Sequence, residues 1–280
     1  MQGLSAATSV VAVVGDPIAH SLSPAIHNAG FAQAGLDWVC VALPVAAGQA
    51  AAAAAGIRAL GLRGVSVTMP HKSDMVDQVD ELTPVAAALS SVNCLIPEDG
   101  RLIGDNTDGA GFLAGLRDDF DWEPSGRSCM VIGAGGAARA VVLALAGAGA
   151  SSVVVVNRSP ERAQQAAALA GAVGSVGHGA DLDGIDLVVN ATPVGMGDSA
   201  ALPLDPDGLT DAHVVAELVY HPAVTPLMAA ASARGCRTSN GVSMLVHQAA
   251  VAFERWTGVD APIDAMSAAA RSAIAARTPG

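Results

Sequence analysis

The stretch RSCMVIGAGGAARAVVLALAGAGASSVVVV, residues 127–156, decides the fold of this chain. Residues 127–132 end in an apolar run that predicts a buried strand, and a glycine-rich turn follows at once. Alanine and leucine dominate residues 137–147, which predict a helix, and the β-branched run at 153–156 predicts a second strand. A strand, a helix and a further strand in this order form the repeating unit of a parallel sheet.

The same alternation continues on both sides of this stretch. Downstream we expect a helix at 160–170 and strands at 187–190 and 214–218. Upstream, strands at 10–14, 38–43 and 64–69 alternate with helices, a helix is expected at 80–90, and residues 244–276 are mostly helical. The predicted fold class is therefore α/β, with a doubly wound parallel sheet in the middle of the chain and a separate α/β unit before it.

Composition limits the classes of partner. The 280 residues carry 14 Lys and Arg against 26 Asp and Glu, a net charge of −12, which argues against nucleic acid and anionic membranes. Residues 140–157 lack charge, but the glycines and serines in their middle predict a helix, a turn and a buried strand rather than a membrane span. No basic segment precedes the first apolar run, so we expect no signal peptide and a cytoplasmic protein.

Cysteines and histidines do not predict a metal site. The four cysteines are far apart and form no CxxC pair, so we expect buried free thiols in a reducing compartment. The seven histidines show no HExxH or other ligand spacing. His20 and His27 are separated by Pro24, and a structural role is the better interpretation of both.

The glycine-rich turn predicts a nucleotide site. Glycines between a strand and a helix let the backbone approach a pyrophosphate, and the N–H groups of the helix N-terminus point at it. The spacing here is GxGGA rather than GxGxxG, and a tight turn needs glycine for structural reasons alone. The strand, turn and helix context favours the nucleotide. The candidate residues of the turn are Gly133, Ala134, Gly135, Gly136 and Ala137.

The end of the next strand predicts which nucleotide is bound. An NAD site usually has an acidic residue here for the ribose 2′-hydroxyl, but this chain has Asn157, Arg158 and Ser159, with Arg162 one helical turn later. Two guanidinium groups at a helix N-terminus suit a 2′-phosphate, so NADP is favoured. The alternative is a pair of solvated surface arginines.

Two polar segments predict the chemistry. Lys72 follows an apolar strand and Pro70, and the turn GDNTDG at 104–109 carries Asp105 and Asp108. A lysine and a carboxylate together can shuttle a proton, and a proton shuttle with a dinucleotide indicates an oxidoreductase acting on an alcohol or ketone. The alternative for Lys72 is an ordinary surface lysine.

Two further segments have a functional and a structural interpretation. The hydroxyls of Ser21 and Ser23 can hold a carboxylate, or Ser23 can simply cap the helix that follows. Residues 190–196, NATPVGM, follow a strand and can approach the nicotinamide side of a cofactor, or form an ordinary turn.

Taken together, these motifs resemble the shikimate dehydrogenase family. The matching segments keep the family's order and extend over nearly the whole chain. They are HSLSPAIHN at 20–28, VTMPHK at 67–72, SVN at 91–93, GDNTDG at 104–109, GAGGAARA at 133–140, NRSPERA at 157–163, NATPVGM at 190–196, YHPAVTP at 220–226 and GVSMLVHQAAVAFERW at 241–256.

The resemblance implies a two-lobed enzyme. A substrate-binding lobe would comprise 1–108 and 242–280, and an NADP-binding Rossmann-type domain 109–241. The reaction would be reversible hydride transfer between NADPH and the C3 carbonyl of 3-dehydroshikimate, with Lys72 and Asp108 as the catalytic pair. The expected partners are this small substrate and no nucleic acid or membrane, in a monomer or homodimer.

The resemblance also assigns binding residues. Ser21 and Ser23 would hold the substrate carboxylate with help from Tyr220. The remaining pocket residues would be Ser66, Thr68, Asn93 and Gln248. Besides the turn, Asn157, Arg158, Ser159 and Arg162, the cofactor residues would be Thr192, Met196, Leu218, Gly241 and Met244.

Three positions depart from the family's pattern. Ser66 stands where an asparagine that contacts the substrate is more usual, Glu217 replaces an aspartate, and His71 occupies a variable position. Ser66 keeps quinate and an amino-substituted shikimate open as substrates. A cofactor-sensing binding protein without turnover is a further alternative, which the presence of both Lys72 and Asp108 disfavours.

Overall fold

The structure is a computed structural model that describes residues 4–178 and 181–276. Contacts divide the chain into two units, one of Met1–Thr107 with Val246–Gly280 and one of Asp108–Leu245. The domain boundaries expected from the sequence placed Asp108 and residues 242–245 in the other unit. The boundaries differ because helix α4 begins at Asp108, while helix α8 (Val242–Thr257) continues unbroken from one unit into the other.

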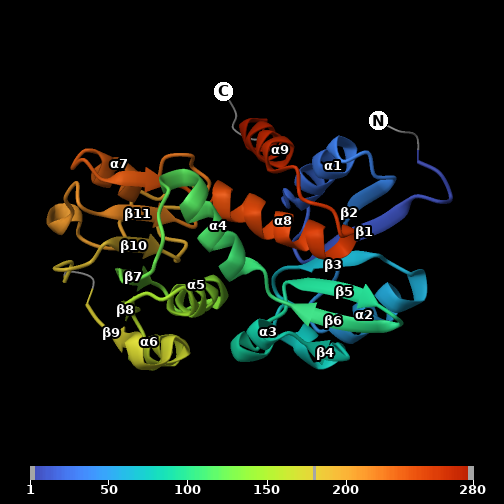
Figure 1. Ribbon diagram of the computed structural model, residues 1–280, viewed down its shortest axis with the longest axis horizontal. Helices are drawn as coiled ribbons and strands as arrows, with labels where there is room; N and C mark the ends of the chain where they lie inside the picture. Colours follow the sequence, from blue (N-terminus) through green and yellow to red (C-terminus); the bar gives the residue numbers. More distant parts are fainter. Residues whose placement is uncertain (1–3, 179–180, 277–280) are drawn as a thin grey trace. The chain divides into compact units, whose positions relative to one another are not determined.

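The first unit is built on a mixed six-stranded sheet (Figure 1). Its strand order is β2-β1-β3-β5-β6-β4, with β1 parallel to both neighbours and β5 antiparallel to both of its own. The strands are β1 (Ser9–Gly15), β2 (Trp38–Pro44), β3 (Gly64–Val67), β4 (Glu81–Leu82), β5 (Cys94–Glu98) and β6 (Arg101–Asp105). The helices are α1 (Ser23–Gln33), α2 (Ala50–Leu60), η1 (Asp74–Gln78), α3 (Pro84–Leu89), the main part of α8 and α9 (Ile263–Ala275).

The helix predicted at 80–90 is only partly right. Residues 81–82 instead pair with β6, and α3 begins at Pro84 after the capping hydroxyl of Thr83. Asp80 holds the strand in place because its carboxylate accepts hydrogen bonds from the Leu102 amide and from Arg58. Tertiary hydrogen bonds have overridden the local helical preference of an acidic, alanine-rich segment.

Helix α8 packs closely on the first sheet. The indole N–H of Trp256 donates to the carbonyl of Leu95 at 3.0 Å, and a Cβ on Gly64 would collide with the same indole ring. Trp256 also contacts the buried His27 ring, with centroids 4.9 Å apart. Gly64 therefore serves close packing of a helix on a strand.

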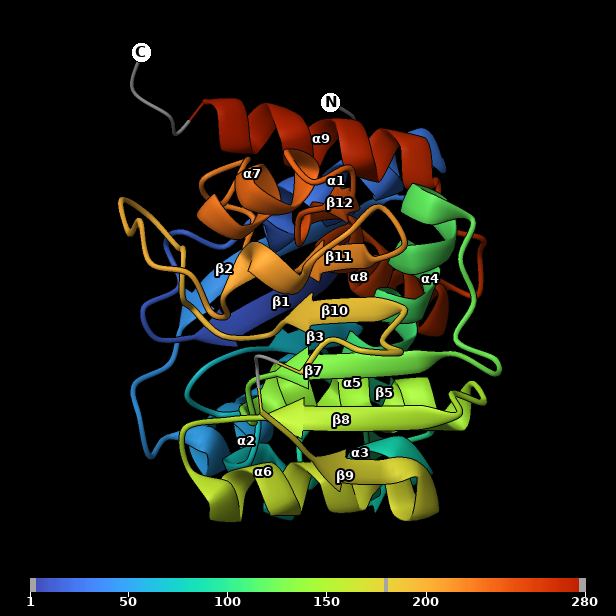
Figure 2. The same cartoon turned by 90° about the vertical axis from the view of Figure 1, so that its left-hand side faces the viewer.

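The second unit is a doubly wound parallel sheet, as the sequence predicted (Figure 2). Its order is β12-β11-β10-β7-β8-β9, and each strand runs parallel to its neighbours. The strands are β7 (Ser128–Ile132), β8 (Ser152–Val156), β9 (Gly174–Val176), β10 (Leu187–Asn190), β11 (Val214–Glu217) and β12 (Arg237–Ser239). The helices are α4 (Asp108–Phe120), α5 (Gly136–Gly147), α6 (Pro160–Ala167), η2 (Ala168–Val173), η3 (Pro206–Gly208) and α7 (Pro226–Ser232).

Two apolar layers enclose this second sheet. One joins side chains of α4, α5 and α6 to the strands, and the other joins α7 and the 182–209 region to the opposite face. Both layers are made largely of Val, Leu and Ala, so the strands are buried on both faces, as parallel strands usually are. The uncharged stretch 140–157 is the end of α5, a turn and β8, as predicted.

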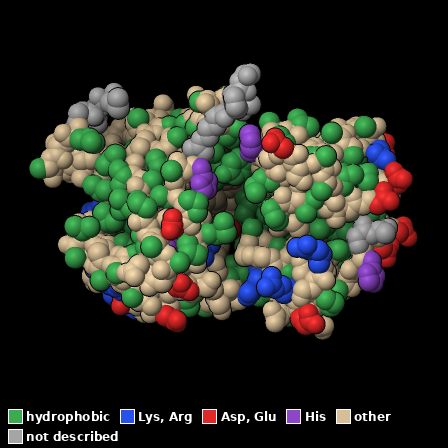
Figure 3. All heavy atoms as spheres, turned by 180° about the vertical axis from the view of Figure 1, so that it is seen from behind, with side chains coloured by type: hydrophobic (Ala, Val, Ile, Leu, Met, Phe, Trp, Pro, Cys, Tyr) green, Lys and Arg blue, Asp and Glu red, His purple; other side chains and the backbone are tan. Residues whose placement is uncertain are grey.

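On the face of the molecule drawn in Figure 3, charged side chains are fewer than hydrophobic ones. No helix within 4–178 and 181–276 is long and apolar enough to cross a membrane. The four cysteines are free and buried, and burial raises the pKa of Cys40 and Cys129 to about 12, so neither thiol is a nucleophile at neutral pH.

Candidate active site

One edge of the first sheet gathers most of the predicted substrate residues. The parallel strands β1 and β3 end there at Gly15 and Val67. The loop after β1 lies against the segment after β3, since the amide of Asp16 donates to the carbonyl of Met69 at 3.0 Å. A Cβ on Gly15 would lie 2.5 Å from a methyl of Thr68, so glycine permits this close approach. The loop with Ser21 and the strand end with Thr68 are thus neighbours.

Ser21 and Ser23 lie at the start of α1. Ser23 is the first residue of the helix and makes no capping bond with its side chain. The hydroxyl of Ser21 instead accepts the backbone N–H of Ser23 at 3.2 Å. Leu22 is the N-cap residue of α1 and no side chain of the described residues caps this helix, so the structure does not support the capping interpretation of Ser23. Ser23 is buried and Ser21 half-buried.

Lys72 is fixed by a hydrogen-bonded frame. Its carbonyl accepts the amide of Val92 at 2.8 Å. The adjacent Asn93 is buried, donates from Nδ2 to the Thr107 hydroxyl at 3.1 Å, and accepts the Thr107 amide at 2.8 Å. Asp108, the other predicted catalytic residue, follows Thr107 directly. Its backbone is therefore attached to the same hydrogen-bonded frame that holds the backbone of Lys72.

The two carboxylates of the GDNTDG turn have different surroundings. Asp105 is 5% exposed and accepts the Thr83 hydroxyl at 2.6 Å and the Asn106 amide at 2.8 Å. Asp105 thereby fixes the turn. Asp108 is the first residue of α4, where the helix dipole favours a negative charge. Asp105 therefore stabilises the turn, whereas Asp108 remains the predicted catalytic aspartate.

A cavity of about 430 Å³ lies at the carboxyl ends of the strands of the second sheet. Its lining includes the predicted Gly133, Ala134, Gly135, Asn157, Arg158 and Thr192. It also includes residues that were not individually predicted, namely Ile132, Val156, Ala191, Pro193, Val194, Leu202 and Pro203. Ala191, Pro193 and Val194 belong to the NATPVGM motif, but no signal in the sequence indicated 202–203.

The glycines of the turn serve two purposes. Gly133 has φ +120°, and a Cβ there would lie 2.8 Å from the Ala191 carbonyl oxygen, so the fold itself requires this glycine. A Cβ on Gly135 or Gly136 would meet no atom within 4 Å beyond its neighbours in the chain, and neither glycine has a positive φ. Packing does not explain why they are glycines. Open space in front of the α5 N-terminus fits the pyrophosphate of a dinucleotide.

Arg158 lines the cavity, and Arg162 lies one helical turn later, in α6. Arg158 and Arg162 are exposed, and within the described part of the chain neither side chain forms an ion pair. Ser159 caps α6, because its hydroxyl accepts the Arg162 amide at 3.4 Å, and it also donates to Glu161. Asn157 donates to the Ser159 carbonyl at 3.1 Å. The arginines are therefore available to an anion.

Other predicted cofactor residues lie outside this cavity. Leu218 and Met244 line a smaller hollow between α4, β11 and the start of α8. Gly241 packs against Leu218, whose carbonyl oxygen a Cβ at 241 would strike. Met196 is 56% exposed, and Ala137 lies half-buried in the first turn of α5.

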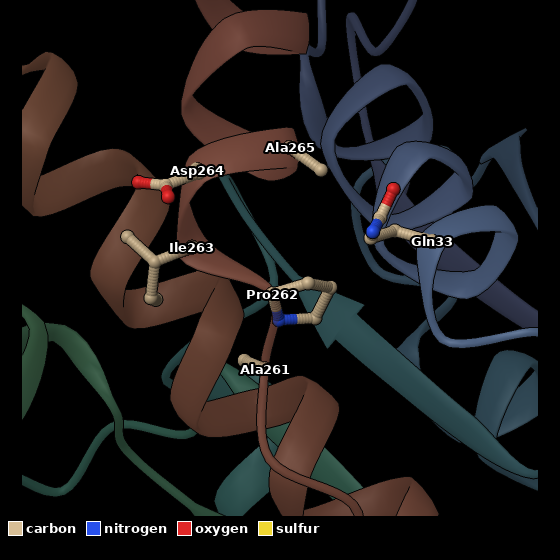
Figure 4. A pocket seen from close by; sticks show the side chains of 6 residues that line it. All are labelled: Gln33, Ala261, Pro262, Ile263, Asp264 and Ala265. Carbon is tan, nitrogen blue, oxygen red and sulfur yellow. The ribbon is translucent and has the colours of Figure 1, made fainter.

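The remaining predicted substrate residues are half-buried. They are Ser66 in β3, Tyr220 after β11 and Gln248 in α8. A second hollow of about 490 Å³ lies beside Gln33 and the start of α9. Figure 4 shows Ile263 and Asp264 projecting away from Gln33, and no predicted site residue lines this hollow.

Three family models match the chain. They are the shikimate dehydrogenase substrate binding domain at residues 13–95, shikimate / quinate 5-dehydrogenase at 117–192, and the shikimate 5′-dehydrogenase C-terminal domain at 241–271. The shikimate dehydrogenase (NADP(+)) of Moorella thermoacetica is 44% identical to this chain, over an alignment that covers 99% of this chain and 97% of the Moorella protein. The chain belongs to the shikimate dehydrogenase family.

Solved structures that are similar to this chain support the same family assignment. Shikimate 5-dehydrogenase from Thermus thermophilus, in complex with NADP(H) and shikimate, has a TM-score of 0.89 at 36% identity and covers 95% of this chain and 99% of its own. Quinate dehydrogenase from Corynebacterium glutamicum, in complex with NAD, has a TM-score of 0.88 at 30% identity and covers 95% and 99%. The family assignment made from the motifs is confirmed.

Proposed function

We propose that this protein is an NADP-dependent shikimate dehydrogenase, which reversibly reduces 3-dehydroshikimate to shikimate. One observation carries the proposal: in a chain similar to shikimate dehydrogenases over its whole length, the cavity at the glycine turn leaves open space at Gly135 and Gly136 and has Arg158 in its lining. The space suits a pyrophosphate, and the guanidinium suits a 2′-phosphate.

The cofactor would be held by three features of the second unit. Gly135 and Gly136 would let the pyrophosphate approach the N-terminus of α5. Arg158 and Arg162 would bind the 2′-phosphate, since the chain has no acidic side chain at 157–159 to bind a free 2′-hydroxyl. Thr192 would face the nicotinamide half. When bound, NADPH supplies the hydride.

The proton would be handled by Lys72 and Asp108. A carbonyl that receives a hydride becomes an alkoxide, which the Lys72 ammonium stabilises and protonates. Asp108 would orient the lysine and accept a hydrogen bond from a substrate hydroxyl. The frame of Val92, Asn93 and Thr107 supports this role, because it fixes the backbone beside both residues.

The substrate would be held at the edge of the first sheet. The Ser21 and Ser23 hydroxyls would bind its carboxylate with Tyr220, and Thr68, Asn93 and Gln248 would meet the ring hydroxyls. The close approach at Gly15 supports this arrangement, since it joins the serine loop to Thr68. We expect a cytoplasmic monomer or homodimer.

Absorbance at the NADPH band tests the proposal. The purified chain is mixed with shikimate, quinate or aminoshikimate, each with NADP and with NAD. Shikimate with NADP should give the highest kcat/KM. No turnover with any pair, combined with measurable NADPH binding, would favour the cofactor-sensing binding protein.

Ser66 favours one second candidate, a quinate dehydrogenase. Its hydroxyl replaces a longer amide at the substrate edge of β3, which leaves room for an extra substituent or a water. A kcat/KM for quinate equal to or above that for shikimate would establish this activity instead. Ser66→Asn should then shift the ratio toward shikimate.

A further inference from the structure

A buried carboxylate lies beneath the nucleotide cavity at the end of β11. Glu217 is 2% exposed, and β10 and β11 pair with Asn190 opposite it. Its Oε2 accepts Nδ2 of Asn190 at 2.7 Å, and its Oε1 accepts the Thr225 hydroxyl at 2.7 Å. A buried charge is costly unless it is paired or hydrogen-bonded, and these donors meet that need.

Asn190 connects this carboxylate to the cavity wall. Its Oδ1 accepts the Thr192 amide at 3.1 Å and the Thr192 hydroxyl at 2.7 Å, and its Nδ2 also donates to the Val194 carbonyl at 3.1 Å. Thr192 and Val194 both line the cavity. The turn that forms one wall is therefore bonded to a single amide side chain.

Glu217 supports the orientation of that amide together with the Thr192 amide and the Val194 carbonyl. An ionised carboxylate only accepts hydrogen bonds, so Nδ2 of Asn190 must face it and Oδ1 must face the turn. A neutral amide at position 217 could present either a donor or an acceptor, so it would weaken the contact that supports this orientation and leave the Thr192 amide and the Val194 carbonyl to hold Asn190.

We infer that Glu217 is a positioning residue for the cofactor: its ionised carboxylate orients Asn190 and so holds the Thr192–Val194 wall of the nucleotide cavity in its binding shape. The inference rests on the proposed function, because it takes this cavity as the NADP site. Glu217 itself does not line that cavity but the smaller hollow at α4.

The ionisation of Glu217 falls in the range where the enzyme would work. Burial raises its pKa to about 7, against the hydrogen bonds from Thr225, Asn190 and the Val219 backbone, which lower it. Asp119 of α4 lines the same hollow, and Tyr220 and His221 follow in the loop after β11. Asp186 and Arg237 lie at the opposite ends of β10 and β12, and α7 carries no titratable side chain.

The test compares NADPH binding by Glu217→Gln, Thr225→Val and the unmodified full chain, by fluorescence titration across pH 6 to 8. Glu217→Gln should weaken NADPH on the order of 10-fold above pH 7, the effect of losing one hydrogen bond to a charged group, with little change in the KM for shikimate. The unmodified protein should lose affinity below pH 7 more steeply than Glu217→Gln. The 2′-phosphate titrates in both proteins, so their difference isolates Glu217.

Thr225→Val is the matched control. It removes the other partner of Glu217 and the cap of α7, so it destabilises the fold but leaves the Asn190 contact in place. At pH 8 its NADPH affinity should stay closer to that of the unmodified protein than to that of Glu217→Gln, and because losing the Thr225 hydrogen bond raises the pKa of Glu217, its affinity should begin to fall at a higher pH than in the unmodified protein. An equal loss in Thr225→Val and Glu217→Gln would overturn the inference, because general destabilisation would then explain both.

A second variant covers the case in which Glu217→Gln does not fold. Asn190→Ala removes the connection itself and should weaken NADPH to a similar extent. Unchanged binding in Asn190→Ala, or in a folded Glu217→Gln, overturns the inference alone. An unmodified protein that binds no NADPH overturns the cofactor assignment, and the inference with it.

Discussion

At the scale of single residues, we expect Lys72 to act in the chemical step rather than in substrate binding. Its backbone carbonyl accepts the Val92 amide in the first unit, and we propose that its side chain acts on the substrate. A lysine that protonates an alkoxide acts in the transition state, so its removal should slow the reaction more than it weakens substrate binding.

Lys72→Ala should lower kcat by a factor on the order of 100 to 10,000, the usual range for a positioned acid or base. The KM for shikimate should change much less, and NADPH binding should not change. Asp108→Asn should also slow turnover. Steady-state kinetics with both substrates provides the measurement, and near-normal kcat in Lys72→Ala would remove the lysine from the mechanism.

Arg158 should determine the choice of cofactor. A charge-assisted hydrogen bond contributes roughly 1.5–3 kcal/mol, so Arg158→Ala should weaken NADP about 10- to 150-fold, and its exposure places it toward the lower figure. NAD lacks the 2′-phosphate and should be affected little. Arg271→Ala, an exposed arginine of α9, is the control. Equal losses of both cofactors in Arg158→Ala would indicate a structural arginine.

At the scale of elements, the turn between β7 and α5 contains glycines with different roles. Gly133 is needed by its positive φ and by the nearby Ala191 carbonyl, whereas Gly135 has an ordinary φ of −79° and open space around it. The sequence motif does not distinguish the two, and only the structure assigns one to the fold and the other to the ligand.

A pair of alanine substitutions tests this assignment. Gly133→Ala should destabilise the fold by roughly 1–3 kcal/mol, the usual cost of a strained backbone position. Gly135→Ala should leave the melting temperature near its original value but weaken NADPH, because its methyl group would occupy the space for the pyrophosphate. Thermal melts and NADPH titration of both variants decide the matter. Loss of stability with intact binding in Gly135→Ala would contradict the assignment.

At the scale of the whole molecule, periodicity predicted the class of fold and most elements. The β-branched runs and the glycine turn indicated the doubly wound sheet because parallel strands are buried on both faces. The helix at 80–90 was wrong in its first turn because the Asp80 hydrogen bonds are long-range. Residues 202–203 and the Asn190–Glu217 pair were missed because tertiary structure, not sequence spacing, brings 202–203 to the cavity and sets Asn190 of β10 beside Glu217 of β11.

Stability of the whole protein should depend on His27. Its ring is fully buried, its two nitrogens have no hydrogen-bond partner among the described residues, and burial lowers its pKa to about 4. The neutral ring is favoured in the folded state, so its contribution is complete above pH 6.5 and is lost as the pH falls toward 4.

His27→Leu should remove this loss. The free energy of unfolding of the variant relative to the unmodified protein should rise by about 3 kcal/mol between pH 7 and pH 4. Urea unfolding at several pH values measures it. A constant difference across that range would show that His27 does not titrate on unfolding.

Transfer of a label from the substrate to the cofactor tests the central claim most directly. Shikimate carrying deuterium at C3 is incubated with NADP and the full chain, and the reduced cofactor is analysed by mass spectrometry. Hydride transfer from C3 predicts deuterated NADPH and slower turnover than with unlabelled shikimate. Reduced cofactor without deuterium, or no reduction of NADP at all, would contradict the account.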